Sequence, residues 1–181
     1  MTKAIGTFLQ NAVFVIVALA LVLLIRGFVF QPFLVRGDSM MPNFHNGDYL
    51  IVDELSYRFL RDPTRGEVIV FKFPGDTSQK YIKRVIGLPG ESVEIKEGKV
   101  YILSNGEPAL LEERYLDPQE RTEGFTSLTL KDNEYFVMGD NREFSSDSRR
   151  WGTLPRNEII GKALLRIFPF QDFAAFAAPA Y

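Results

Sequence analysis

The fold class is indicated by residues 67–90, EVIVFKFPGDTSQKYIKRVIGLPG. The two apolar parts of this stretch, Glu67 to Phe73 and Tyr81 to Ile86, are rich in Val, Ile, Phe and Tyr. These residues are enriched in β-strands, whereas the Pro and Gly residues between and after them favour turns. The pattern therefore predicts two consecutive strands closed by turns.

The rest of the chain after the first 30 residues repeats this pattern. Further strand-like runs lie at Ser92–Ile95, Val100–Leu103, Glu134–Met138 and Lys162–Phe168. Lys96–Lys99 is expected to form a hairpin turn, and Asn105-Gly106 offers the positive φ that a further hairpin would use. Residues 114–125 are polar and lack periodicity, which is typical of a surface loop. We therefore expect a mostly β body over residues 31–181.

The N-terminal segment, residues 1–30, has a different composition. Its residues 4–25 are almost wholly apolar, and as a helix they would span roughly 33 Å, which exceeds a hydrocarbon core of about 30 Å. One transmembrane helix over about residues 4–25 is predicted. A buried core helix and a cleaved signal peptide are the alternatives, but residues 26–30, RGFVF, lack a small-x-small cleavage site. The flanking charges, Lys3 against Arg26 and Arg36, do not fix the orientation.

Composition excludes several classes of function. The 181 residues suffice for one globular unit plus an appendage. The chain has no Cys, so disulfides and Cys-based zinc sites are excluded. Since every charge before Gly37 is positive and the net charge is −2, the body is acidic, which argues against a nucleic-acid partner. The aromatic and alanine-rich C-terminal stretch, Phe173 to Tyr181, is expected either to edge the core or to contact a membrane surface.

Ser39 lies in the first of three segments that strand composition explains poorly, GDSMMP at residues 37–42. The glycine before it and the proline after it constrain the backbone. Such a turn can expose a hydroxyl and aim its own N–H at a developing oxyanion. The simpler interpretation is that Ser39 only forms a turn.

Lys83 lies in the second segment, where alternation places it on the same strand face as Tyr81 and Val85, with Arg84 on the opposite face. If that face is buried, desolvation lowers the lysine pKa and makes the amine a candidate base. The alternative is a lysine that extends to water. His45, the only histidine, would need a tight local fold to reach Ser39, so Lys83 is the favoured base.

The third segment, GDNREFSSDSRRWG at residues 139–152, is dense in Asp, Asn, Ser and Arg. A calcium loop is excluded because Asp140, Glu143 and Asp147 lack the alternating ligand spacing and the arginines add opposing charge. A hydrogen-bonded surface loop is the structural alternative. No metal or other cofactor is therefore expected.

These segments together resemble the bacterial type I signal peptidases. The SMMP turn at residues 39–42, the strand RGEVIVF at 65–71, YIKR with GLPG at 81–90, and the loop from Gly139 to Arg149 match that family's motifs in order. The resemblance implies that Ser39 is the nucleophile, Lys83 the general base and Ser145 a hydroxyl that orients the amine. It also implies two structural charge pairs beside the site, Asp147 with Arg149 and Arg84 with Asp140.

The resemblance further implies paired antiparallel sheets carried on one N-terminal transmembrane helix, with the catalytic body on the extracytoplasmic side of the cell membrane. Substrates would be preprotein signal peptides with small residues at positions −1 and −3, bound as an extended strand. The implied pocket walls are Val35, Phe44, Val70, Tyr81 and Ile82. The oligomeric state is not indicated.

Two positions depart from the family pattern. Some members have a serine at the position of Gly37, whose hydroxyl helps to bind the oxyanion, so here only the Ser39 N–H can be named. Asn43 replaces a common threonine, for which we expect a local effect.

Two other functions are alternatives to this one: a membrane-anchored β-domain that binds a partner without chemistry, and a self-cleaving Ser/Lys peptidase of the repressor kind. The latter carry a DNA-binding domain where this chain has its apolar segment.

Overall fold

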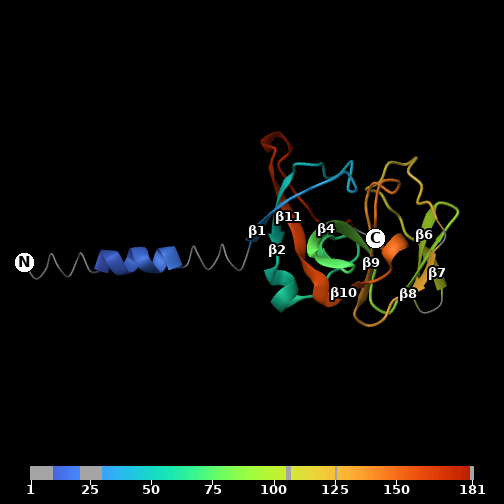
Figure 1. Ribbon diagram of the computed structural model, residues 1–181, viewed down its shortest axis with the longest axis horizontal. Coiled ribbons are helices and arrows are strands. Elements are labelled where there is room, and N and C mark those ends of the chain that lie inside the picture. Colours follow the sequence, from blue (N-terminus) through green and yellow to red (C-terminus); the bar gives the residue numbers. More distant parts are fainter. Residues whose placement is uncertain (1–9, 21–29, 105–106, 125, 180–181) are drawn as a thin grey trace, which may run out of the picture.

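Two antiparallel sheets make up most of the computed structural model, which describes residues 10–20, 30–104, 107–124 and 126–179 (Figure 1). The first sheet has the strand order β1-β2-β11-β3-β4-β9-β10, with β12 paired to β11. Its strands are β1 (Phe30–Leu34), β2 (Tyr49–Asp53), β3 (Val68–Phe73), β4 (Asp76–Gly87), β9 (Glu134–Met138), β10 (Leu154–Pro155), β11 (Ile159–Phe168) and β12 (Ala174–Ala175). A late strand, β11, thus joins two early hairpins.

The second sheet has four strands in the order β7-β6-β5-β8 and lies on the far side of the body from the N-terminal helix (Figure 1). Its strands are β5 (Ser92–Lys96), β6 (Lys99–Ser104), β7 (Glu107–Leu110) and β8 (Thr126–Thr129). Glu97 and Gly98 turn the chain between β5 and β6 with φ of 53° and 75°. Two successive positive φ values match the right-handed strand twist, which explains the hairpin at this glycine.

Buried apolar side chains form three clusters. One lies between the sheets and includes Ile86, Val93, Ile102 and Phe136. The other two lie on opposite faces of the first sheet. One face carries Val35, Met40, Phe44, Val52, Val70 and Ile82, and the other carries Ile69, Phe71, Val85, Tyr135 and Leu154. Because β4 alternates between these faces, Ile82 and Lys83 point in opposite directions.

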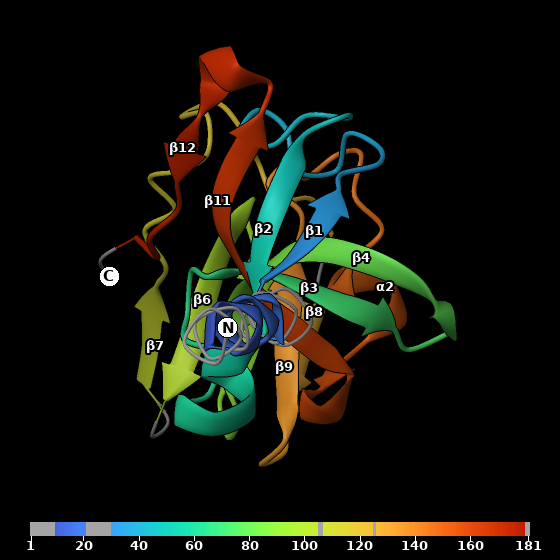
Figure 2. The same cartoon turned by 90° about the vertical axis from the view of Figure 1, so that its left-hand side faces the viewer.

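Short helical turns connect the strands. They are η1 (Ser56–Leu60), a single π turn, α2 (Ser148–Trp151), η2 (Arg156–Glu158) and η3 (Phe170–Asp172). Asp147 caps α2, since its side chain accepts a hydrogen bond from the Arg149 N–H. Figure 2 looks along the N-terminal helix at the strands of the first sheet, with α2 beside them.

The mostly β architecture is confirmed, with differences in detail. The strand β4 begins five residues before the predicted start at Tyr81. Six strands, β1, β2, β7, β8, β10 and β12, were not predicted, because each has only two to five residues and too short a pattern to indicate a strand. The proposed turn at Asn105-Gly106 lies outside the described residues. The C-terminal stretch edges the core in part, because β12 pairs with β11 and Phe176 packs on the Val35 cluster, whereas Phe173 is exposed.

The N-terminal helix covers residues 10–20 and exposes nearly all of its side chains. Within the described ranges, no helix is both long and apolar enough to cross a membrane. The remaining parts of the predicted span, residues 4–9 and 21–25, lie outside those ranges. The transmembrane helix therefore stays a prediction.

Candidate active site

Lys83 is buried in the middle of β4, with only 4% of its surface exposed. It lies opposite Ile69 of β3, and its Nζ is 5.5 Å from the Tyr81 ring centroid, on the same strand face. The amine donates to Ser39 Oγ at 2.7 Å and to the Ile82 carbonyl at 2.9 Å. Burial lowers the Lys83 pKa to about 8, against the opposing charges of Asp147 and Asp140. A large fraction of this amine is thus neutral near pH 8.

Ser39 is held in a coil of tight turns that follows β1. Gly37 has φ of 84°, which favours glycine, and its N–H donates to the Asn46 side chain at 3.0 Å. The Met41 N–H donates to the Asp38 carbonyl at 3.1 Å, and the buried Met40 side chain fixes the turn to the core. These contacts leave the Ser39 hydroxyl half-buried and directed at Lys83.

The loop after β9 holds the Ser39 backbone from the other side. The Asn141 N–H donates to the Ser39 carbonyl at 3.1 Å, and the Asn141 side chain donates to the Asp38 carbonyl at 3.1 Å. Gly139 lies so close to Ser39 O and to Ser145 that a β-carbon at this position would overlap both. A residue other than glycine would therefore separate the two loops.

Ser145 is buried in this loop, 3% exposed. Its Oγ is close enough to Asp147 to help to lower the pKa of that carboxyl, but it meets no hydrogen-bond geometry with any described residue. Lys83 Nζ donates to Ser39 and Ile82 and not to Ser145. The structure thus brings Ser145 into the site region without a direct bond to the amine, and its orienting role stays a prediction.

Asp147 and Arg149 form a buried ion pair. The Arg149 guanidinium donates to both Asp147 oxygens at 2.8 Å, and the Gly139 N–H donates to the same carboxylate at 3.1 Å. Burial alone would raise the Asp147 pKa, but the Arg149 hydrogen bonds and charge outweigh it and the pKa is lowered. Because Arg149 also donates to the Arg142 carbonyl at 2.7 Å, the pair closes the loop on itself.

Arg84 and Asp140 form the second pair, on the opposite face of β4. Arg84 donates to the two Asp140 oxygens at 2.8 and 2.6 Å, and its guanidinium lies 4.0 Å from the Tyr115 ring centroid. Asn43 donates to Asp140 at 2.9 Å and to the Tyr115 carbonyl at 3.0 Å. The amide that replaces the common threonine therefore joins the Ser39 coil to this pair and to the 114–125 loop.

A cleft of about 770 Å³ opens beside Ser39 and Lys83. Its walls come from β1, the Ser39 coil, β4 and the loop after β9, and include Phe33, Ser39, Tyr81, Ile82, Phe144 and Ser146. Of the five predicted wall residues, Tyr81 and Ile82 line the cleft. Val35, Phe44 and Val70 are buried in the adjoining cluster with Ile82. Phe144 was missed, although an aromatic residue within a polar loop is a signal that sequence reasoning could use.

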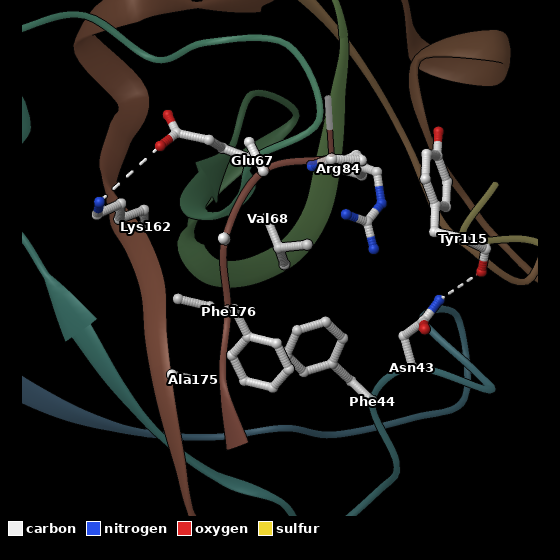
Figure 3. Close-up of a pocket in the computed structure, with 13 residues that line it drawn as sticks. Asn43, Phe44, Glu67, Val68, Arg84, Tyr115, Lys162, Ala175 and Phe176 are labelled. Carbon is white, nitrogen blue, oxygen red and sulfur yellow. Dashed lines mark hydrogen bonds and ion pairs between the residues drawn. The ribbon is translucent and has the colours of Figure 1, made fainter. Parts of the chain in front are cut away.

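A second cavity of about 450 Å³ lies behind this cluster, on the Arg84 face of β4. Figure 3 shows Phe44 and Phe176 facing one another in it, with ring centroids 4.4 Å apart. Glu67 and Lys162 form an ion pair of 3.9 Å at the far side. Because Phe176 belongs to the C-terminal stretch, that stretch supports Phe44 from behind.

His45 lies on the surface, and its ring makes no hydrogen bond with Ser39 among the described residues. In the same part of the chain, no group of three or more His, Cys, Asp or Glu side chains is placed to hold a metal ion. The arrangement offers a hydroxyl nucleophile bonded to an amine of lowered pKa, beside an open cleft. Such a pair is suited to acyl transfer.

Comparison with known proteins agrees with this chemistry. A family model described as signal peptidase, peptidase S26, matches residues 8–168. A probable signal peptidase I-1 of Synechocystis sp. is 44% identical over 167 residues, which cover 88% of this chain and 82% of the relative. A signal peptidase I of Bacillus amyloliquefaciens is 40% identical, over 87% of this chain and 84% of the relative. A crystal structure of a signal peptidase I from Enterococcus faecalis, 33% identical, covers 56% of this chain and 97% of that one, with a TM-score of 0.48.

Proposed function

Because this chain belongs to the signal peptidase family, peptidase S26, we propose that it removes signal peptides from exported preproteins with Ser39 as nucleophile and Lys83 as general base. Membership makes it a signal peptidase I, a serine endopeptidase. The assignment of the two residues rests on one observation, the 2.7 Å contact between Lys83 Nζ and Ser39 Oγ in a buried setting.

In the first half of the reaction, the neutral Lys83 amine takes the Ser39 hydroxyl proton while Oγ bonds to the carbonyl carbon of the −1 residue. The Ser39 N–H stabilises the resulting oxyanion. The Gly37 N–H already donates to Asn46, so no second donor is assigned from that residue. Lys83, now an ammonium, gives its proton to the departing amine as the peptide bond breaks. The mature protein leaves, and the signal peptide remains as an ester of Ser39.

In the second half, Lys83 takes a proton from a water molecule that attacks the ester carbonyl. The ester bond breaks, and the proton held by Lys83 returns to Ser39 Oγ. The same amine thus acts as base and acid twice, which a pKa near the working pH favours. In this proposal Ser145 orients the Lys83 amine, and the Asp147–Arg149 pair fixes the loop that packs on Ser39.

Small residues at positions −1 and −3 are the proposed specificity. Tyr81 and Ile82 present the cleft surface next to Ser39, and Val35, Phe44 and Val70 fill the space beneath. A filled wall accepts alanine and obstructs larger side chains. The substrate would lie as an extended strand along the free edge of β1, or along the part of β4 before Arg84 that does not pair with β9.

We place the catalytic body on the extracytoplasmic side of the cell membrane, tethered by the apolar N-terminal segment. This arrangement is supported by the apolar composition of residues 12–25 and by the need to meet a preprotein whose own hydrophobic segment lies in the bilayer. A binding domain without chemistry would have no use for a buried lysine bonded to a serine hydroxyl. A self-cleaving repressor-type peptidase would cut its own chain and leave a preprotein intact.

The test is preprotein cleavage by the detergent-solubilised full chain, followed by gel electrophoresis. Ser39→Ala is expected to abolish cleavage, because it removes the attacking oxygen and almost no volume. Ser127→Ala is the matched control, since Ser127 is an exposed serine on β8 of the second sheet, outside the cleft, and should keep wild-type turnover. Wild-type turnover by Ser39→Ala would refute the assignment.

A further inference from the structure

Residues 173–179, the C-terminal strap, turn one large side chain toward the core. Much of the strap is exposed, including Phe173, which is 62% exposed. The side chain of Phe176, in contrast, packs against the buried cluster that contains Phe44 and Ile82. Phe176 is therefore the aromatic residue through which the strap contacts the core.

Phe176 and Phe44 make a direct aromatic contact. Their ring centroids are 4.4 Å apart with a tilt of 37°, and Figure 3 shows the two rings facing one another. Phe44 is only 1% exposed and shares its cluster with Ile82, whose side chain lines the Ser39 cleft. Because Ile82 borders the cleft and Phe44 borders the strap, this cluster separates the two.

The cavity of about 450 Å³ borders both aromatic rings. Protein cores contain few voids larger than a water molecule, so the far side of a buried ring is normally filled. On the strap side, Phe44 instead has open space beside its contact with Phe176. The Phe176 ring, more than dense packing, therefore limits how far the Phe44 ring can move away from the cleft.

Backbone hydrogen bonds fix the position of Phe176 along β11. Ala175 of β12 pairs with Leu165 of β11, and the Phe176 N–H donates to the Leu164 carbonyl at 3.0 Å. The strap is thus in register with a central strand of the first sheet. This register sets the height at which the Phe176 ring meets Phe44.

The side chain of Arg166 joins the strap to the chain around Phe44. On the strap side, its guanidinium donates to the Asp172 carbonyl at 2.8 Å and lies 5.6 Å from the Phe176 ring centroid. On the other side, it donates to the Asn43 carbonyl at 3.1 Å and to the buried Asp48 carboxylate at 2.8 Å. One side chain therefore fixes the spacing between the two segments that carry the rings.

We propose that Phe176 is a positioning residue that determines how large a substrate side chain the Ser39 cleft admits. With Phe176 in place, Phe44 cannot recede and Ile82 keeps its position at the cleft wall. The pocket then stays shallow and accepts alanine in preference to larger residues. This inference deepens the proposed function and rests on it, because it concerns which substrates the same site accepts.

The test measures substrate preference with the detergent-solubilised full chain. Two preprotein peptides that differ only at position −1, alanine or leucine, compete in one reaction, and mass spectrometry gives the ratio of their kcat/KM values. This ratio does not depend on the amount of folded enzyme, so a loss of stability alone leaves it unchanged. Phe176→Ala should raise the leucine-to-alanine ratio by about tenfold, because Phe44 relaxes into the vacated space.

Further variants of the strap serve as controls. Phe173→Ala removes the same ring from an exposed position and should leave the ratio at its wild-type value. Phe176→Met retains most of the apolar volume and should stay within about twofold of the wild type. If Phe176→Ala gives too little folded protein, Phe176→Val leaves a smaller void and should raise the ratio by about fivefold.

A double-mutant cycle tests whether Phe176 acts through Phe44. Phe44→Ala removes the ring that Phe176 supports, so the addition of Phe176→Ala to this variant should change the ratio by less than about twofold. A further tenfold rise in the double variant would show that Phe176 affects the cleft without Phe44, and the positioning role would be wrong.

The outcomes keep this inference apart from the proposed function. If the wild type does not cleave the alanine peptide, the peptidase mechanism itself fails. A wild-type ratio for Phe176→Ala and Phe176→Val, even at a reduced rate, would show that the ring only stabilises the fold, and it would overturn this inference alone. An equal rise for Phe173→Ala would also overturn it, because the effect would then come from a general loosening of the strap.

Discussion

Gly139 lies against Ser145 so closely that a β-carbon at position 139 would overlap the Ser145 hydroxyl, and it would overlap the Ser39 carbonyl oxygen as well. The backbone of Gly139 is therefore the spacer between the nucleophile coil and the loop that carries Ser145. Even one methyl group there must push these two loops apart. A displacement of about 1 Å at a reacting group can reduce a rate by about a hundredfold.

We expect Gly139→Ala to lower kcat by about a hundredfold while the protein stays folded. The measurement is steady-state cleavage of a preprotein, with circular dichroism and thermal unfolding as the check on folding. Glu143→Ala, an exposed position in the same loop but outside the cleft, should behave like the wild type. Wild-type kcat for Gly139→Ala would show that the loops tolerate separation and that their contact does not position the dyad.

The pH profile should report the Lys83 pKa of about 8. Only the neutral amine accepts the Ser39 proton, so kcat/KM should fall about tenfold per pH unit below that value and level off above it. The sign follows from burial, which favours the neutral form and brings the pKa down from that of a free lysine. A profile that is flat from pH 6 to 9 would remove Lys83 as base.

Lys83→Arg should be inactive even though the positive charge is retained. Guanidinium stays protonated at any working pH and cannot accept the Ser39 proton. His45→Ala is the comparison, because His45 is exposed and should be dispensable. The measurement is the turnover of a fluorogenic preprotein peptide by both variants, compared with that of the wild type. Normal rates for Lys83→Arg, or loss of activity in His45→Ala alone, would move the base away from position 83.

A substrate with leucine in place of alanine at position −1 should be cleaved at least about a hundredfold more slowly. The Ile82 wall next to Ser39 is backed by the buried residues Val35, Phe44 and Val70, so we expect that it does not recede to admit three further carbons. Competition between the two substrates in one reaction measures the ratio of kcat/KM. Equal consumption of both would refute the assigned wall.

Asp140→Asn should destabilise the body by about 3 kcal/mol, because it leaves the buried Arg84 guanidinium beside an amide in place of a carboxylate. The matched control is Asp62→Asn, which breaks the ion pair of the 77% exposed Asp62 with Arg156 and should cost no more than about 0.5 kcal/mol. Urea unfolding of both variants gives the difference. Similar losses in the free energy of unfolding would show that the buried Arg84–Asp140 pair contributes no more to stability than the exposed Asp62–Arg156 pair.

Strand periodicity was sufficient to predict the centre of the fold. The runs that form β3 and β4 are long and strongly apolar, so the sequence was enough to predict them as strands. The alternation along β4 correctly placed Tyr81 and Lys83 on one face of the strand. The short edge strand β1, with its proline, carries no such signal and is stabilised only by pairing with β2. Its existence depends on tertiary contacts that a local pattern does not contain.

The sequence indicated the site residues whose chemical type is unusual for their surroundings. It did not indicate the residues whose role depends on contacts between distant parts of the chain. A lysine within an apolar strand and a serine in a constrained turn pointed to the pair before the 2.7 Å contact was known. The role of Asn43 as a bridge between Asp140 and Tyr115 was not readable, because its partners lie 72 and 97 residues away. Likewise, periodicity cannot tell that Phe176 would pack against Phe44.

The position of β11 has a consequence for when this enzyme becomes active. Ser39 lies in the connection between β1 and β2, and Lys83 belongs to the β3–β4 hairpin. The strand β11 joins these two hairpins in the sheet. During synthesis, residues 159–168 emerge long after both hairpins. A chain that ends before residue 159 therefore has both reactive groups and the Asn141 contact to Ser39, but it lacks the strand that joins the two hairpins in one sheet. We therefore expect the peptidase to become active only after nearly all of its chain has emerged.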